Sequence, residues 1–289
     1  MIADMENLEY YCLETCKIVA QAADFIRGKL GKIQKGEIEE KSLNSLVSYV
    51  DRMAEKHLVD GLGRLLPGSV FLTEEETIVT QNGTYQWIID PLDGTTNFLH
   101  QLPGFAVSVA LQYRQQTVLG VVYEVTRKEC FYAWREGGAF LNGEKIQVSP
   151  KTGLNKALIA TGFPDQDCGK IKKYLEAYQY FLQNTMGLRR FGVASVDMVY
   201  TACGRFDAYF QYGLHPWDVA AGALIVQEAG GVVSDFQGGE NYLFGKEILA
   251  SNRFVTPEFL AIIKAVFYGK NTKNKNALEV YNKSASELQ

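Results

Sequence analysis

Hydrophobic residues recur at three- and four-residue spacing near the start of the chain, which predicts amphipathic helices. The first helix spans about residues 5–30 and ends at Gly28 and Gly31. The second spans about residues 45–65 and stops at Pro67-Gly68, a pair that commonly terminates helices. We interpret the charged residues 36–41 as a connection between the two helices.

After residue 100 the hydrophobic pattern changes to short strand-like runs separated by polar connections. The last of these runs contains Asn142-Gly143, a pair typical of a hairpin turn, so the pattern predicts an antiparallel meander. Residues 149–153 interrupt it, and we expect residues 1–150 to form an N-terminal α+β half. The runs lie at residues 106–111, 118–123, 130–134, 139–141 and 146–148.

Strands and helices alternate in residues 151–268, which predicts a C-terminal α/β half. One apolar helix spans about residues 217–229 and ends at two glycines, a common C-terminal signal. The last helix is expected to begin with Thr256 as N-cap, followed by proline. Residues 269–289 are polar, and we expect a weakly ordered tail with a short helical stretch around 277–281. Further strands are expected at about 157–161, 187–191, 206–211, 232–234 and 248–250, and further helices at about 171–182 and 193–203.

The composition is that of an ordinary globular protein and excludes few classes of function. The 289 residues are 47% hydrophobic, and 29 basic against 33 acidic side chains leave a net charge of −4. This small acidic excess argues against general nucleic-acid binding. Because the sequence shows neither an apolar run of membrane-spanning length nor a secretory leader, we expect a cytoplasmic protein without a membrane partner.

The cysteines and one helical histidine favour structural roles. The five cysteines are scattered and odd in number, so we expect no disulfides in a reducing compartment. Cys12 and Cys16 share a helix face, where core packing is favoured over a metal pair. His57 lies within the second helix and is interpreted as a packing or surface residue.

Residues 87–98, with the sequence WIIDPLDGTTNF, carry the strongest candidate chemistry. The apolar start is typical of a buried strand, and the proline after Asp90 favours a stiff turn that directs Asp90 and Asp93 to one side. Carboxylates and the carbonyl of Leu92 are the oxygen ligands that Mg²⁺ prefers. The same residue types also occur in turns that have no function.

The residues after these carboxylates predict an anion site. Gly94 lets the backbone approach a ligand closely. The amides of Gly94, Thr95 and Thr96 would be unpaired at the start of a helix, where they attract phosphate. The Thr95 hydroxyl is placed to orient a water molecule.

Two further acidic residues fit this site, although each has a simpler explanation. Glu74 begins a run of three glutamates after a short strand at residues 70–72, a pattern typical of a solvated loop. Asp218 lies in the first turn of the apolar helix, where the helix dipole favours a negative charge.

In this order the three segments resemble the inositol monophosphatase family of Mg²⁺-dependent, lithium-sensitive phosphatases. That family carries Glu-Glu after a short strand, then W-[IV]-[IV]-D-P-[IL]-D-G-T-x-N-[FY], then W-D-x-A-[AG]-x. The chain matches with Glu74-Glu75, residues 87–98 and residues 217–222, and the similarity extends from the first helix to about residue 267. The resemblance implies an α+β fold, the layered αβαβα sandwich shared with fructose-1,6-bisphosphatase.

The resemblance also implies a ligand set suited to two-metal phosphoryl transfer. One Mg²⁺ would bind Glu74, Asp90 and the Leu92 carbonyl. A second would bind Asp90, Asp93 and Asp218, so that Asp90 bridges the two ions.

Catalytic and substrate contacts are implied in the same way. Glu74 and Thr95 would position the attacking water, and Asp51 matches a family aspartate behind them. The substrate contacts implied are Asp93, Gly94, Thr95, Thr96, Gly192, Ala194, Gln211 and Asp218.

Departures from the family pattern leave the organic half of the substrate open. The family often has an acidic residue where this chain has Gln211, Ser45 replaces a family aspartate, and Lys41 matches a family lysine only with shifted spacing. Inositol 1-phosphate is the leading substrate. Fructose bisphosphate, 3′-phosphoadenosine nucleotides and histidinol phosphate are alternatives.

The resemblance implies a homodimer that acts on a small-molecule phosphate ester. A regulatory binding protein is the alternative, since some bacterial family members take part in RNA-polymerase-associated complexes. The retained carboxylates favour catalysis, and the acidic net charge makes nucleic acid an unfavoured partner.

Overall fold

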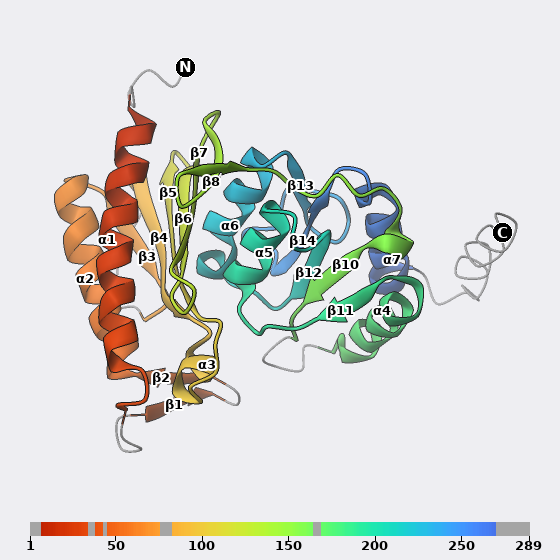
Figure 1. Ribbon diagram of the computed structural model, residues 1–289, viewed down its shortest axis with the longest axis horizontal. Coiled ribbons are helices and arrows are strands. Elements are labelled where there is room, and N and C mark those ends of the chain that lie inside the picture. Colours follow the sequence, from red (N-terminus) through yellow and green to blue (C-terminus); the bar gives the residue numbers. More distant parts are fainter. Residues whose placement is uncertain (1–6, 34–37, 43–44, 76–82, 164–168, 270–289) are drawn as a thin grey trace, which may run out of the picture.

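Five layers of helices and sheets make up the fold (Figure 1). In order they are α1 with α2, a seven-stranded sheet, α5 with α6, a five-stranded sheet, and α4 with α7. This computed structural model describes residues 7–33, 38–42, 45–75, 83–163 and 169–269, and its layers confirm the expected α+β sandwich. The helices are α1 (Leu8–Lys29), α2 (Tyr49–Leu65), α3 (Thr95–Leu99), α4 (Ile171–Asn184), α5 (Ala194–Ala202), α6 (Pro216–Glu228) and α7 (Thr256–Tyr268).

The first sheet has the strand order β3-β4-β5-β6-β7-β8-β9. Only β3 and β4 pair in parallel, and the other neighbours are antiparallel, which confirms the predicted meander. The strands are β3 (Val70–Thr73), β4 (Tyr85–Asp93), β5 (Ala106–Tyr113), β6 (Gln116–Glu124), β7 (Glu129–Trp134), β8 (Gly138–Leu141) and β9 (Glu144–Ile146).

The second sheet has the order β11-β10-β12-β14-β13. Strand β10 is parallel to both of its neighbours, whereas β14 is antiparallel to β12 and β13. The carboxyl ends of β10 and β12 therefore lie side by side. The strands are β10 (Leu158–Thr161), β11 (Gly187–Arg189), β12 (Ala208–Tyr212), β13 (Gly231–Ser234) and β14 (Glu247–Asn252).

Helix α6 lies between the two sheets and is buried on all sides. Every residue from Val219 to Val226 is buried, because the helix contacts β5 and β6 of the first sheet as well as β13 of the second. This position explains why the helix is apolar throughout rather than amphipathic. The core that it helps to form contains residues from both halves of the chain. The predicted division into separate halves at residues 149–153 therefore stays a prediction.

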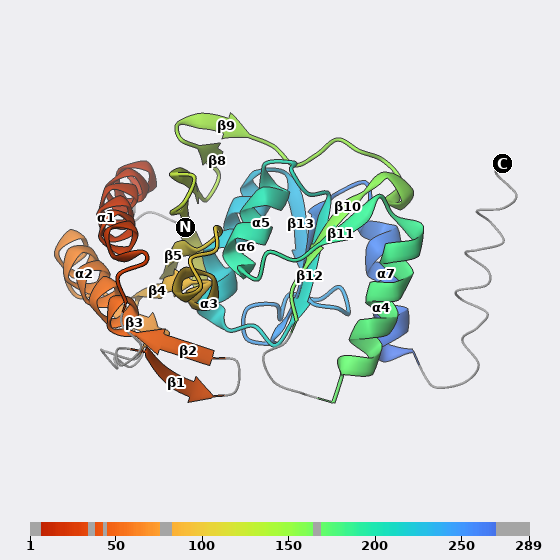
Figure 2. The same cartoon turned by 60° about the horizontal axis from the view of Figure 1, so that its bottom comes forward.

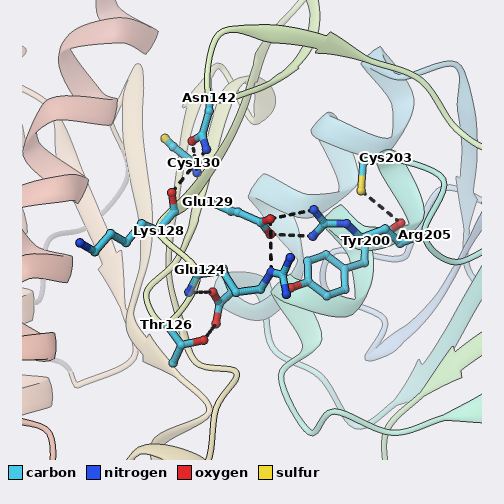
Figure 3. Close-up of polar contacts among 10 residues, drawn as sticks. Glu124, Thr126, Lys128, Glu129, Cys130, Asn142, Tyr200, Cys203 and Arg205 are labelled. Atoms are coloured by element: carbon cyan, nitrogen blue, oxygen red, sulfur yellow. Dashed lines mark hydrogen bonds and ion pairs between the residues drawn. The ribbon is translucent and has the colours of Figure 1, made fainter.

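A charged cluster also links the two halves (Figure 3). Arg205, after α5, donates two hydrogen bonds to Glu129 of β7, with N···O distances of 2.6 and 2.7 Å. These bonds lower the pKa of Glu129, mainly because they stabilise its charged form. The Arg127 guanidinium lies 3.2 Å from the same carboxylate.

The structure corrects the start of the second helix. Residues predicted as a charged connection and a helix start instead form the antiparallel strands β1 (Ile38–Ser42) and β2 (Ser45–Ser48), seen beside α2 in Figure 2. Lys41 thus lies in β1, and Ser45 begins β2. The helix starts later because Ser48 and Asp51 form a capping box, with Ser48 accepting from the Val50 amide at 3.2 Å.

Smaller predictions are settled as follows. Thr256 is the first residue of α7 rather than its N-cap, and its hydroxyl donates to the Asn252 carbonyl. His57 is exposed and its ring packs edge-on against Phe25, with the ring centroids 5.1 Å apart, as expected for a packing or surface residue. Four cysteines within the described ranges, Cys12, Cys16, Cys130 and Cys203, are free thiols.

Among the described helices, none has the length and apolar character needed to cross a membrane. Cys168 and the predicted tail at 270–289 lie outside the described residues.

Candidate metal and phosphate site

A β-bulge at the end of β4 brings Asp90 and Asp93 together. Asp90 pairs with Ser108 and Asp93 with Ala106, so β4 has one residue more than β5 between these pairs. Residues three apart in a regular strand point to opposite faces, and the extra residue corrects this. Pro91 fits the bulge because it has no N–H to donate to the sheet. The predicted tight turn is therefore wrong, although the predicted proximity of the two carboxylates is retained.

Gly94 connects this bulge to α3 in a conformation that favours glycine. Its φ angle is 90°, in the left-handed region. A Cβ atom here would lie 2.8 Å from the Val193 side chain and 3.2 Å from the Gly104 carbonyl oxygen. The amides of Thr95 and Thr96 then lie in the first turn of α3, where they have no intrahelical acceptors. These donors follow directly after the carboxylates, as predicted, and Thr96 is exposed.

Asp90 is the centre of a concentration of negative charge. Its side chain is 1% exposed. Burial raises its pKa well above the ordinary value, and Glu74, Asp93 and Asp218 raise it further by repulsion. The structure therefore brings the four predicted carboxylates into electrostatic range of one another. Within the described ranges, no three of these side chains lie close enough together to coordinate one ion.

Thr95 and Asp51 meet beside this cluster. The Thr95 hydroxyl lies 2.9 Å from Asp51 Oδ1 and 2.9 Å from the Leu92 carbonyl oxygen, and donates its proton to one of them at a time. Asp51 is buried in the capping box of α2, and burial raises its pKa despite the hydrogen bonds from Ser48 and Thr95. The capping box thus fixes the carboxylate that holds Thr95.

Glu55 supports the strand end that carries Glu74, and the sequence reasoning missed it. Its side chain is fully buried. It accepts hydrogen bonds from the Thr73 hydroxyl at 3.0 Å and from the Glu75 amide at 2.8 Å. Glu74 lies between these two donors, so Glu55 fixes the backbone on both sides of it.

Helix α5 reaches Asp93 through Ser195, a second missed residue. The Ser195 amide and hydroxyl both donate to Asp93 Oδ2, at 2.7 and 2.6 Å. This contact brings the start of α5, which begins at the predicted substrate-side residue Ala194, to Asp93, although the Ala194 side chain is only 6% exposed. Gly192 lies two residues before this start, and its predicted substrate contact stays a prediction. The two donors fix the orientation of the Asp93 carboxylate through its Oδ2 atom.

The remaining predicted residues lie on α6 and β12. Asp218 Oδ2 accepts from the His215 amide at 2.6 Å, so this carboxylate caps the start of α6, where the helix dipole also favours its charge. Gln211 is half-buried near the end of β12, where its Oε1 accepts from the Tyr209 hydroxyl at 2.8 Å. Tyr209 lies within electrostatic range of Asp93 and Asp218, which connects Gln211 to the site.

Asp197 in α5 is a buried carboxyl group that no sequence motif marked. It is fully buried, and neither of its oxygens has a hydrogen-bond partner among the residues that the structure describes. Burial raises its pKa well above the ordinary value, Asp93 raises it further, and Arg190 opposes the shift. The sequence around Asp197 is that of an apolar helix and matches no functional motif. Only the fold shows that both carboxylate oxygens face the interior.

Asp197→Asn is expected to make stability less dependent on pH. A carboxyl whose pKa is raised on folding stabilises the protein below its unfolded pKa, and this contribution is lost as pH rises through the folded pKa. Between pH 5 and 8 the free energy of unfolding of the variant should therefore gain about 1 kcal/mol or more relative to the parent. Urea unfolding measures this difference, with exposed Asp60→Asn as the control. Parallel pH profiles of parent and Asp197→Asn would contradict it.

The donor set fits Mg²⁺. Hard divalent cations take carboxylate and carbonyl oxygens, and the residues around Asp90 supply both kinds of oxygen. The repulsion that raises the pKa of Asp90 is what a divalent cation would relieve. Glu74, Asp90, Asp93, Asp218 and the Leu92 carbonyl are the residues that would hold it.

Comparison with known proteins decides the family. The profile of the inositol monophosphatase family matches residues 8–267. The chain belongs to the inositol monophosphatase family. The resemblance found in the sequence is therefore confirmed, and membership supports a phosphatase.

Relatives of this inositol monophosphatase family member agree in sequence and in fold. Nus factor SuhB of Pseudomonas aeruginosa is 42% identical over 236 residues, which are 80% of this chain and 87% of that protein. The structure of extragenic suppressor protein SuhB from Bartonella henselae matches with a TM-score of 0.82 and 37% identity, over 86% of this chain and 96% of that one. Inositol monophosphatase from Anabaena matches with a TM-score of 0.78 and 30% identity, over 89% and 96%.

Proposed function

We propose that this protein hydrolyses a small sugar or polyol phosphate monoester in a Mg²⁺-dependent reaction in the cytoplasm. Inositol 1-phosphate is the leading substrate. The observation that carries the proposal is the buried Asp90 among Glu74, Asp93 and Asp218, directly before the amides at the start of α3. The four carboxylates, whose mutual repulsion a cation would relieve, thus lie next to backbone amides that can donate hydrogen bonds to a phosphate.

The phosphate group would bind the amides of Gly94, Thr95 and Thr96. Bound Mg²⁺ supplies Lewis-acid activation of water and stabilises charge on the leaving oxygen. When the Thr95 hydroxyl donates its proton to Asp51, its lone pairs can accept a hydrogen bond from the attacking water. Glu74 would accept the second hydrogen bond of that water, so the two residues together would aim its oxygen at phosphorus.

A substrate panel tests this proposal. Phosphate release is measured with inositol 1-phosphate, fructose bisphosphate, 3′-phosphoadenosine nucleotides and histidinol phosphate, with Mg²⁺ and then with a chelator. We expect turnover that requires Mg²⁺ and that lithium inhibits at millimolar concentration. Absence of turnover on every compound would overturn the proposal, and turnover that lithium leaves unchanged would argue against the two-metal assignment.

The relatives named Nus factor SuhB support a second candidate, a regulatory protein of RNA polymerase. Co-purification from cell extract tests it directly. RNA polymerase recovered equally with the parent and with Asp93→Asn would support this role, because binding would then not depend on the metal site. Recovery with neither protein would count against it.

A homodimer remains part of the proposal. Leu175 and Leu182 of α4, together with Met186 and Phe191 near the edge strand β11, are between 41% and 62% exposed. Leu175 and Leu182 are seven residues apart and therefore lie on the same face of α4, and exposed apolar side chains of this kind are typical of a subunit contact. Light scattering on the full chain measures the oligomeric state.

A further inference from the structure

A polar groove lies at the far end of α6 from the metal site. Its volume is about 640 Å³, which is within the range of small-molecule sites. Asp218 lies in the first turn of α6, whereas Gln227 and Glu228 at its end line the groove. The helix rises roughly 14 Å between Asp218 and Gln227. The groove is therefore separate from the candidate metal and phosphate site.

Segments from both halves of the chain form the walls of this groove. The hairpin of β5 and β6 contributes Gln112 and Gln116, α6 contributes Gln227, and the segment between β13 and β14 contributes Asn241 and Phe244. Four of these side chains are neutral amides, and the fifth is an aromatic residue that is 63% exposed. The walls thus offer hydrogen bonds beside an apolar ring.

Gln112 is a buried polar side chain that lines the groove. It is only 2% exposed. Its Nε2 donates to the Thr117 hydroxyl oxygen at 3.5 Å. Within the described residues, its Oε1 accepts no hydrogen bond. Because a buried amide oxygen without a donor is costly, this position favours a ligand that supplies a donor.

Neighbouring side chains orient two further amides. Arg135 Nη1 donates to Gln116 Oε1 at 2.6 Å, so Gln116 keeps its NH₂ group for a ligand. Gln227 Nε2 donates to the Tyr242 hydroxyl at 3.3 Å, which leaves Gln227 Oε1 as an acceptor. The groove thus presents oriented acceptors together with an oriented donor. Hydroxyl groups match this arrangement, because each can both donate and accept hydrogen bonds.

The charged side chains of the groove disfavour an anion. Arg135 lines it together with two acidic residues, Glu228 and Glu240. The two carboxylate oxygens of Glu228 accept from the amides of Glu136 and Gly138, each at 2.9 Å. The balance of charge is therefore slightly negative, and part of it is already engaged by the backbone. A neutral ligand suits these walls better than a phosphate or a carboxylate.

We propose that this groove binds a neutral saccharide. The hydroxyl groups of the sugar pair with the amides, and its C–H face packs against the electron-rich face of the Phe244 ring. The predominance of amides over aromatic surface favours a molecule with many hydroxyl groups over a flat base. This binding function goes beyond the proposed phosphatase activity and does not depend on it.

Saturation-transfer NMR titrations of the full chain without Mg²⁺ test the proposal. The probes are maltose, glucose, glucuronate and adenosine. Glucose and glucuronate differ only at the sixth carbon, which carries a hydroxyl in one and forms a carboxylate in the other. We expect maltose to bind with a Kd of about 1 mM or tighter, and glucose to bind about threefold or more tightly than glucuronate.

Phe244→Ala and Gln227→Ala are each expected to weaken maltose binding by about tenfold, and both replace exposed side chains. Gln112→Met keeps a long unbranched side chain without the amide and should cause a similar loss. Phe254→Ala is the matched control, because it removes an exposed ring outside the groove. Asp93→Asn should also leave the Kd for maltose unchanged. Thermal unfolding establishes that each variant is folded.

Three results would overturn the proposal. The first is a Kd weaker than about 10 mM for both neutral sugars, and the second is tighter binding of glucuronate or adenosine. The third is maltose binding that Phe244→Ala and Gln227→Ala change less than about twofold, or that Asp93→Asn abolishes, since the sugar would then lie elsewhere. If Gln112→Met is poorly folded, the two exposed variants decide. None of these results bears on phosphate release, which tests the phosphatase function separately.

Discussion

Asp93→Asn is expected to lower kcat by roughly 10²- to 10³-fold while the protein remains folded. Asp93 Oδ2 already accepts two hydrogen bonds from Ser195, so we expect Oδ1 to be the oxygen that binds the cation. An amide has one acceptor oxygen instead of two, so the variant can satisfy Ser195 or a cation but not both. The sheet and α3 do not depend on the charge, and the melting temperature without Mg²⁺ should change little.

Mg²⁺-dependent phosphate release measures the loss, and calorimetric titration with Mg²⁺ measures the weakened binding independently of turnover. Asp60→Asn is the matched control, because it removes the same charge from an exposed position on α2. Near-normal turnover of Asp93→Asn at ordinary Mg²⁺ concentrations would show that the assignment of Asp93 as a ligand is wrong.

Gly120→Ala is expected to destabilise the fold by about 3 kcal/mol, at the upper end of the usual range for overpacking. Gly120 of β6 faces α6, where an added Cβ would lie 2.8 Å from the Ala221 carbonyl oxygen and 2.9 Å from its Cα. Its neighbours across the sheet, Ala110 and Ala133, are also small. Because the clash is with backbone, relief requires a shift of the whole helix, which would also displace Asp218 at its start.

Urea unfolding measures the destabilisation, and Mg²⁺ titration of the folded variant measures the displacement of Asp218. Gly28→Ala in α1 is the control. A Cβ there meets nothing within 4 Å, so the substitution should be neutral or stabilise the helix by about 0.5–1 kcal/mol. Equal stability of Gly120→Ala and the parent would contradict the close approach of α6 to the sheet.

Local patterns in the sequence predict most of the fold. The antiparallel meander, the helices and the alternation in the second half follow from hydrophobic period and from turn residues. The errors occur where the same local residue pattern is compatible with two structures. Ser45 begins a strand because the capping box starts α2 only at residue 49. Pro91 sits in a bulge because the strand continues past it to Asp93.

The site was predictable only where its residues lie in a motif. Asp90, Asp93 and the amides after them are consecutive, and Glu74 and Asp218 were connected to them by resemblance to a family. Ser195, Asp197 and Glu55 have no such mark, since their importance depends on contacts between segments far apart in the chain. Ser195 binds Asp93, which lies 102 residues earlier in the chain, and the spacing of hydrophobic residues does not predict this contact.

The burial of α6 on all sides has a consequence for how this protein can diversify. A helix packed between two sheets accepts few substitutions, because each change must suit both neighbours at once. The position of Asp218, in the first turn of this helix, is therefore fixed by the packing of the helix. Gln211, at the half-open end of β12, is under no such double constraint. We therefore expect substitutions to be tolerated more readily at that end of β12 than along α6.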